Sequence, residues 1–180
     1  MRKTLFLLVI VLLIVSSCKK DESVVETVKD EMEKGIYPDI ILKNAEYHIG
    51  EDGSSPIYMT AGKITFYSKD GYALVESMEF VSKDDEGNTS ISGSAVKGRI
   101  DTEGSSMDLS GGVVFKDEER NMEIKAESLV FDRSEDTIVA DGRVMVESKE
   151  GSFIGRDFKG DLRTGVYVFS EIEEGELNFD

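Results

Sequence analysis

The residue best placed to do chemistry is Cys18, the only cysteine of the chain. Two basic residues open the sequence, an apolar run follows from Leu5 to Val15, and two serines stand immediately before the cysteine. A basic start, a short apolar stretch and small residues at a cut site are typical of a secretory signal. A cysteine at the end of Val-Ser-Ser-Cys is typical of a bacterial lipobox, in which the thiol is acylated. We therefore expect a lipoprotein signal peptide at 1–17 and lipidation of Cys18.

The length of the apolar run argues against a membrane-spanning helix. Eleven residues form a helix of about 16 Å, whereas the hydrocarbon core of a bilayer is about 30 Å thick. The alternative is a plain signal peptide that carries an incidental cysteine. Acyl chains on Cys18 would anchor the mature chain to a membrane. Residues 18–37 then form the acylated cysteine and a tether, with a short helix predicted where Ser23 and Glu26 fit a capping box.

Other residues that could carry catalysis are too few or too scattered. His48 is the only histidine, so a zinc site of the usual His/Cys type is not expected. The chain has neither a phosphate-binding loop nor a G-x-S-x-G elbow. The acidic runs 84–88 and 132–136 lack the pattern of a calcium loop and are expected to be solvated turns. We predict no enzymatic activity, no metal and no cofactor.

Charge and length bound the class of protein further. The 180 residues carry a formal net charge of −16, and they suffice for one domain with a sizeable core. Nucleic-acid binding needs clustered Lys and Arg, so an acidic chain is not expected to bind nucleic acid.

The region from 38 to 180 predicts a repetitive β domain. A strand followed by a turn and a second strand recurs about every 30 residues, with openings at Met59, Ile91, Ile124 and Phe153. A fixed period indicates units that cannot bury their apolar faces alone. Glycine-containing turn signals, among them Gly111-Gly112 and Asp141-Gly142, separate the expected strands. The fold class is therefore all-β, an antiparallel sheet of ten or more strands built from repeated hairpins.

Alternation within the strands predicts one dry face along the sheet. One parity is apolar and the other carries charged and hydroxyl side chains, so the sheet must fold over to cover the apolar side. A folded sheet or β-jellyroll, open at its ends, satisfies this. Its interior could be an apolar groove or the filled core of a β-sandwich, and the pattern fits both. The candidate groove-lining residues are Met59, Phe66, Phe80, Phe115, Ile124 and Phe131.

Two further predictions concern backbone geometry. Gly111-Gly112 fits either a bulge next to the dry face or a simple turn. The segment 38–49 is expected at the N-terminal edge of the sheet and the strand beginning at Val166 at the C-terminal edge. Unpaired backbone groups on such edges are templates for strand addition by a partner.

Five segments in order resemble one family. They are Pro-Asp-Ile-Ile-Leu-Lys-Asn-Ala-Glu-Tyr at 38–47, Pro-Ile-Tyr-Met-Thr-Ala-Gly-Lys-Ile-Thr-Phe-Tyr at 56–67, Asp-Leu-Ser-Gly-Gly-Val-Val-Phe at 108–115, Ile-Lys-Ala-Glu-Ser-Leu-Val-Phe-Asp at 124–132 and Gly-Arg-Asp-Phe-Lys-Gly-Asp-Leu at 155–162. The set is similar to LptC, the membrane-anchored periplasmic component of the lipopolysaccharide export machine, which is related to LptA/OstA proteins. The resemblance covers about residues 36–180. One departure is clear, because a lipobox stands where the family has an N-terminal transmembrane helix.

The resemblance implies a non-enzymatic lipid carrier. In it, a β-jellyroll open at its ends holds the acyl chains of lipopolysaccharide or a similar glycolipid. An ABC transporter permease would pair with the N-terminal edge and an LptA-like bridge protein with the C-terminal edge. The expected location is the periplasmic side of the envelope, with Cys18 anchored in the inner membrane. The alternative function is a structural or adhesive surface lipoprotein with a filled β-sandwich core.

Overall fold

The computed structural model describes residues 37–50, 56–101, 103 and 105–178. The predicted signal peptide, Cys18 and almost all of the tether lie outside this part of the chain. The chain comprises two units, Met1–Tyr37 and Pro38–Asp180, and every described strand belongs to the second unit.

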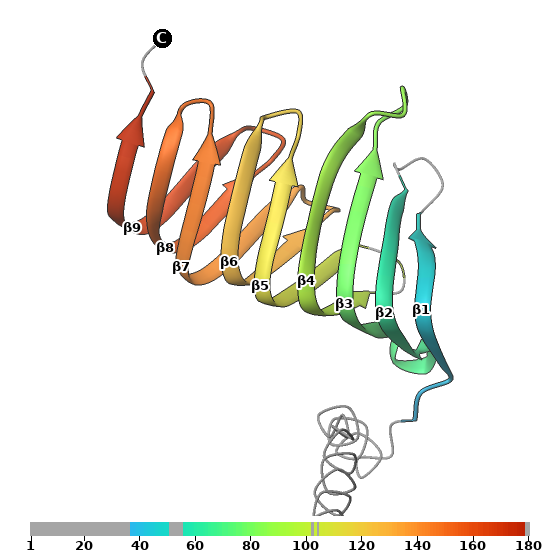
Figure 1. The fold of residues 1–180 in the computed structure, drawn as a ribbon. Helices are drawn as coiled ribbons and strands as arrows, with labels where there is room; N and C mark the ends of the chain where they lie inside the picture. Colours follow the sequence, from blue (N-terminus) through green and yellow to red (C-terminus); the bar gives the residue numbers. More distant parts are fainter. Residues whose placement is uncertain (1–36, 51–55, 102, 104, 179–180) are drawn as a thin grey trace, which may run out of the picture. The chain divides into compact units, whose positions relative to one another are not determined.

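Nine antiparallel strands form a single sheet in which each strand pairs with its neighbours in the sequence (Figure 1). The folded antiparallel sheet built from hairpins is thus confirmed, whereas the expectation of ten or more strands is wrong for the described residues. The strands are longer than predicted because two turn signals lie inside them: Gly111-Gly112 in β5 and Asp141-Gly142 in β7. The strands are β1 (Ile40–Ile49), β2 (Ile57–Tyr67), β3 (Tyr72–Lys83), β4 (Thr89–Asp101), β5 (Ser106–Asp117), β6 (Met122–Asp132), β7 (Thr137–Ser148), β8 (Gly151–Asp161) and β9 (Val166–Leu177), with a short 3₁₀ turn η1 (Ser68–Asp70) between β2 and β3.

A row of irregular positions crosses the middle of the strands and forms a crease. Along this row the pairing is interrupted or shifts register, for example between Ser110 and Val113 of β5 and between Ala140 and Arg143 of β7. Gly111 and Gly112 have φ angles of 84° and 80°, so they form the predicted bulge and not the alternative turn. Bulges bend strands, and here the bends fold the sheet into two facing layers (Figure 1).

Asp157 reinforces the crease through its side chain. Its backbone φ is 50°, and its carboxylate accepts hydrogen bonds from the Gly142 N–H at 2.9 Å and the Ser170 hydroxyl at 3.0 Å. Both bonds favour the ionised carboxylate and therefore lower the pKa of Asp157, and the bond from Gly142 has the larger effect. This carboxylate therefore ties β7, β8 and β9 together where the layers fold.

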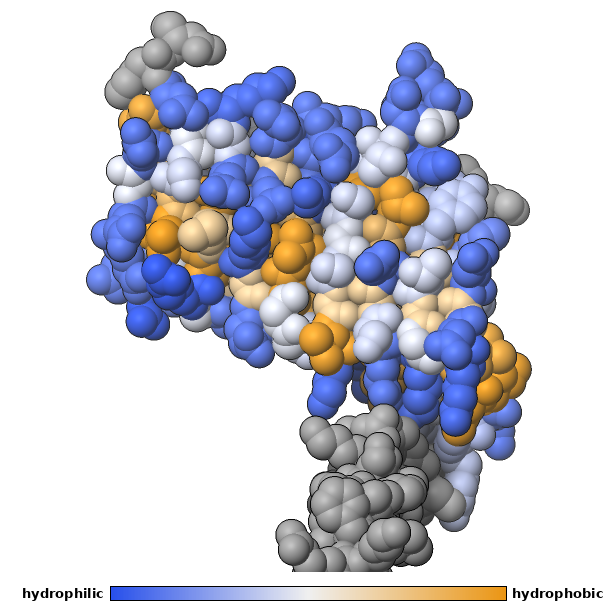
Figure 2. Space-filling view, in the orientation of Figure 1, coloured by the Kyte–Doolittle hydropathy of each residue, from blue (hydrophilic) through white to orange (hydrophobic). Residues whose placement is uncertain are grey.

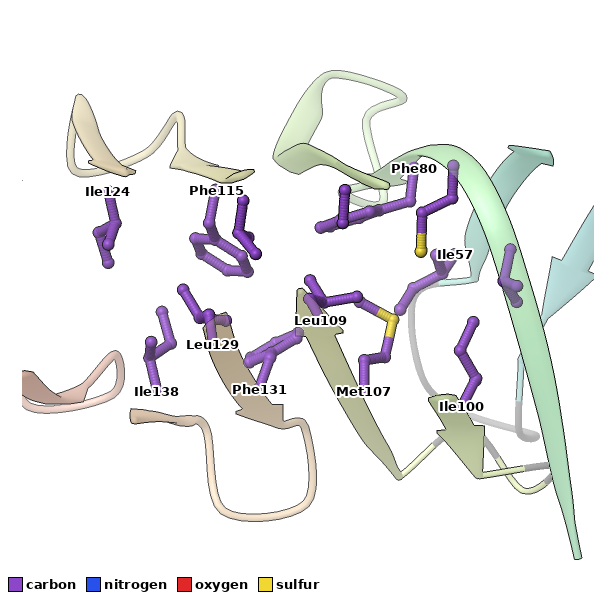
Figure 3. Close-up of a cluster of buried hydrophobic side chains, with 14 of the residues drawn as sticks. Ile57, Phe80, Ile100, Met107, Leu109, Phe115, Ile124, Leu129, Phe131 and Ile138 are labelled. Atoms are coloured by element: carbon purple, nitrogen blue, oxygen red, sulfur yellow. The ribbon is translucent and has the colours of Figure 1, made fainter. Parts of the chain in front are cut away.

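The apolar parity of the strands fills the space between the two layers, as predicted. Phe80, Phe115 and Ile124 point from one layer towards Phe131 and Ile138 of the other (Figure 3). The ring centroids of Phe115 and Phe131 are 5.2 Å apart, in an edge-to-face arrangement. Fully burying one such side chain contributes about 1.5–3 kcal/mol, so this interior is the main source of stability.

The sheet is not closed, and β1 and β9 are its two edges, as predicted. Both carry exposed apolar side chains, including Ile40 and Ile41 on β1 and Val166 and Val168 on β9. The outer surface seen in Figure 2 is otherwise mainly hydrophilic, with apolar side chains in patches between the polar ones.

Candidate functional site

The six candidate groove-lining residues all face the interior of the folded sheet. They belong to one buried cluster, and none is more than 9% exposed. Phe80, Phe115 and Phe131 are ring neighbours, so side chains already occupy the middle of the interior. The sequence allowed either an apolar groove or a filled core, and in this central part of the structure the interior is a filled core.

Open space instead lies along a seam, where the turns that join the strands of the two layers face each other. In a meander, consecutive turns lie at opposite ends of the strands. The crease brings these opposite ends together, so the β5–β6 and β7–β8 turns meet residues of the β8–β9 turn around common cavities. We call this line of facing turns the seam.

One seam cavity has an apolar wall and lies towards the C-terminal edge. Its volume is about 570 Å³, and we call it the apolar cavity. The wall is formed by side chains from β6 to β9, and the rim by charged and polar groups that include Glu119, Lys149 and Glu150. The wall residues are Met122, Val146, Phe153, Phe169 and Ile172, with Arg120 and Tyr167 at the boundary between wall and rim.

Sequence reasoning missed most of this wall. A signal was nevertheless present for Phe153, because it opens the fourth unit of the repeat, as Met59 and Ile124 open earlier ones. Phe169 alternates with Tyr167 in the edge strand, and both pack on Phe158, which is fully buried.

A second seam cavity is polar and contains three arginines. Its volume is about 490 Å³, and we call it the arginine cavity. Arg120, Arg133 and Arg163 line it together with three carboxylates, Asp117, Glu119 and Asp136. Ile91, Phe131 and Leu162 supply its apolar floor, so it borders the buried core.

The β5–β6 turn owes its conformation to Asp117. This residue is 2% exposed, and its carboxylate accepts hydrogen bonds from the backbone N–H and the guanidinium Nη1 of Arg120, at 3.0 and 2.8 Å. A buried carboxylate needs such partners because its desolvation is costly. The pair therefore fixes Arg120 between the two cavities.

Tyr167, which lines the apolar cavity, carries a buried polar atom. Its hydroxyl oxygen is buried and is the one such side-chain atom, among the described residues, without a hydrogen-bond partner. Burial raises the pKa of Tyr167, with the positive charge of Arg120 acting in the opposite direction. An unpaired buried hydroxyl carries a free-energy cost of about 1–3 kcal/mol.

The remaining predicted positions show ordinary structural roles. His48 packs edge-to-face on Tyr58, with ring centroids 4.6 Å apart. The Asp84 carboxylate accepts the N–H groups of Glu86 and Asn88, so the acidic run 84–88 is the expected turn. Within the described ranges, no group of three or more His, Cys, Asp or Glu residues could hold a metal ion. Nor does the described part include a helix long and apolar enough to cross a membrane.

An unclosed antiparallel sheet, folded at a crease over an apolar interior, defines the class of β-jellyrolls with open ends. Among solved structures, the fold is similar to that of LptH from Pseudomonas aeruginosa, described as the LptA homologous periplasmic component of the conserved lipopolysaccharide transport device. The TM-score is 0.57 at 11% identity, and the match covers 73% of this chain and 99% of that one. No significant match was found among curated proteins.

The family follows from the sequence profile that matches the chain. The chain belongs to the LptC-related lipopolysaccharide-assembly family, whose profile matches residues 6–172. The predicted resemblance is thus confirmed, and the chain is a periplasmic component of lipopolysaccharide transport. The alternative of a structural or adhesive surface lipoprotein is not favoured.

Proposed function

We propose that the chain carries lipopolysaccharide or a similar glycolipid by holding its acyl chains between the two layers of the folded sheet. The observation that carries this proposal is the apolar cavity of about 570 Å³, which opens at the seam and adjoins the buried core. Each methylene buried there contributes about 0.8 kcal/mol, so six of them contribute about 5 kcal/mol.

The acyl chains extend from the apolar cavity along the six candidate groove-lining residues. Passage through the filled centre requires side chains that can change rotamer. Met59, Met78, Met107 and Met122 are all buried there, and methionine adapts readily to a changed packing partner. In this proposal the centre is packed when empty and rearranges when a chain enters.

The edges and the N-terminus supply the connections. An ABC transporter permease pairs with β1, and an LptA-like bridge protein adds a strand to β9, since both edges have unpaired backbone groups. Cys18 is lipidated and anchors the chain in the inner membrane. If so, Cys18→Ala leaves an unprocessed precursor or a form that no longer partitions into detergent; unchanged processing and partitioning would contradict the anchor.

Photo-crosslinking tests the seat of the acyl chains. A crosslinking amino acid at Phe169, in the cavity wall, or at Phe131, in the core, should capture glycolipid in cells that produce it. The matched control is Lys125, whose side chain is 47% exposed on the outer face of β6. Equal capture at Lys125 and Phe169 would refute the proposal, and native mass spectrometry of the purified protein would identify the bound lipid.

A further inference from the structure

The two seam cavities share the side chains of Glu119 and Arg120. On one side of Arg120 the walls are apolar, and on the other side they carry Arg133 and Arg163. An apolar space that adjoins a space with several guanidinium groups has the polarity of an amphiphile with an anionic headgroup.

The charge of the arginine cavity departs from that of the chain. The protein has a formal net charge of −16, yet here three arginines face three carboxylates. Two of these carboxylates, Asp117 and Glu119, already pair with Arg120, at 2.8 and 4.0 Å. The Arg163 side chain is 73% exposed and its guanidinium lies 3.7 Å from Asp161. A guanidinium has five N–H donors in a fork that matches phosphate oxygens, so Arg120 and Arg163 retain donors for a ligand.

The Tyr167 hydroxyl gives an independent indication of a polar ligand. It belongs to a residue that lines the apolar cavity together with Arg120, and it is buried without a partner among the described residues. A phosphate oxygen at the boundary of the two cavities would accept a hydrogen bond from this hydroxyl and remove the cost of leaving it unpaired.

We propose that the arginine cavity binds the anionic headgroup of the amphiphile whose acyl chains occupy the apolar cavity. Arg120 and Arg163 contact the headgroup oxygens, and Tyr167 donates a hydrogen bond from the chain side. The inference rests on the proposed acyl-chain function and adds that the headgroup leaves the fold through the seam, between the β5–β6 and β8–β9 turns.

Competition between two probes with the same alkyl chain tests the headgroup alone. The full chain in a short-chain ethylene-glycol detergent is mixed with equimolar dodecyl phosphate and dodecyl maltoside, and bound probe is counted by native mass spectrometry. The wild type should prefer dodecyl phosphate by about tenfold or more, which one charge-assisted hydrogen bond can supply.

Tyr167→Phe, which removes only the hydroxyl, should lower this preference. Arg163→Gln should lose most of it and keep its binding of dodecyl maltoside, because Arg163 lines the arginine cavity and not the apolar cavity. Both variants leave the Arg120–Asp117 pair intact, so the fold is preserved. The matched control is Arg156→Gln, which removes an arginine bound to Glu173 at 3.0 Å outside both cavities and should keep the preference.

Three results would overturn the inference. Equal binding of the two probes by the wild type would refute the headgroup site and leave the acyl-chain function standing. A preference that persists unchanged in Arg163→Gln and in Tyr167→Phe would refute the assigned residues. Binding of neither probe would refute the acyl-chain function together with the headgroup site.

Discussion

Substitution of Phe115 and of Phe169 by alanine distinguishes the packed centre of the folded sheet from the cavity at its seam. The Phe115 ring is fully buried, and its neighbours are the rings of Phe131 at 5.2 Å and Phe80 at 6.2 Å. Phe169, by contrast, is half-buried in the cavity wall, and its ring centroid lies 5.1 Å from that of Phe158. The same substitution, phenylalanine to alanine, should therefore have different consequences at the two sites.

The magnitudes follow from burial. Phe115→Ala removes a fully enclosed ring and should lower the free energy of unfolding by about 3–5 kcal/mol. Phe169→Ala gives up roughly half of a burial term of about 1.5–3 kcal/mol, which is about 1 kcal/mol. Phe115→Leu keeps most of the volume and should cost less than about 1.5 kcal/mol.

Urea unfolding followed by far-ultraviolet circular dichroism measures these losses. With an m-value of about 2 kcal/mol/M, a loss of 4 kcal/mol moves the midpoint by about 2 M. Binding of dodecyl maltoside should fall in Phe169→Ala and persist in the folded Phe115→Leu variant. A loss below about 1 kcal/mol for Phe115→Ala would refute the packed interior, and unchanged binding in Phe169→Ala would refute the cavity as the seat of the alkyl chain.

Three shorter predictions concern the backbone, the crease and the edge. Gly93→Ala should lower the free energy of unfolding by about 1–3 kcal/mol, measured in urea, because a Cβ there would lie 2.5 Å from a backbone oxygen of β5. Gly62→Ala should be nearly neutral, because the nearest atom to its Cβ would lie 3.4 Å away. Equal effects of the two substitutions would contradict the packing. Because the folded pKa of Asp157 is depressed, its contribution to stability is present above about pH 4 and lost as pH falls through the folded value, so acid titration of Asp157→Asn should show a smaller decline than the wild type. Val168→Pro should weaken pull-down of an LptA-like partner while the domain stays folded, and retention at wild-type level would exclude pairing at this stretch of β9.

Period and parity in the sequence were sufficient for the fold class, the edges and the direction of the core side chains. All six candidate lining residues face the interior, because side chains alternate between the two faces of a strand and only one face of this sheet is apolar. Strand number was the error. Gly111-Gly112 and Asp141-Gly142 have the composition of turns, but Gly111, Gly112 and Gly142 have positive φ angles within irregular stretches of strands. Only the pairing on both sides distinguishes such a bulge from a turn.

The seam cavities were beyond sequence reasoning for a different physical reason. Arg120 lies on the β5–β6 turn and Tyr167 on β9, 47 positions later in the sequence. No local sequence pattern predicts that both line one cavity. Their meeting depends on where the crease falls in every strand between them. Arg133 and Arg163 are separated by one repeat, so the period offered a weak signal that needed the fold to interpret it.

Failure to close leaves this sheet with two kinds of opening, and their chemistry differs. At the seam the opening is lined by side chains, and its arginines favour an anionic group beside an apolar chain. At the β9 edge the opening is backbone, flanked by exposed Glu171, Glu174 and Glu176, while Glu173 is held by Arg143 and Arg156 at 3.2 and 3.0 Å. Like charges opposite each other destabilise strand pairs, so this edge disfavours an acidic partner strand. A bridge protein that adds a strand here is therefore expected to present basic or neutral side chains opposite 171–176. The anionic headgroup of the lipid, in contrast, is expected to bind beside the arginines of the seam.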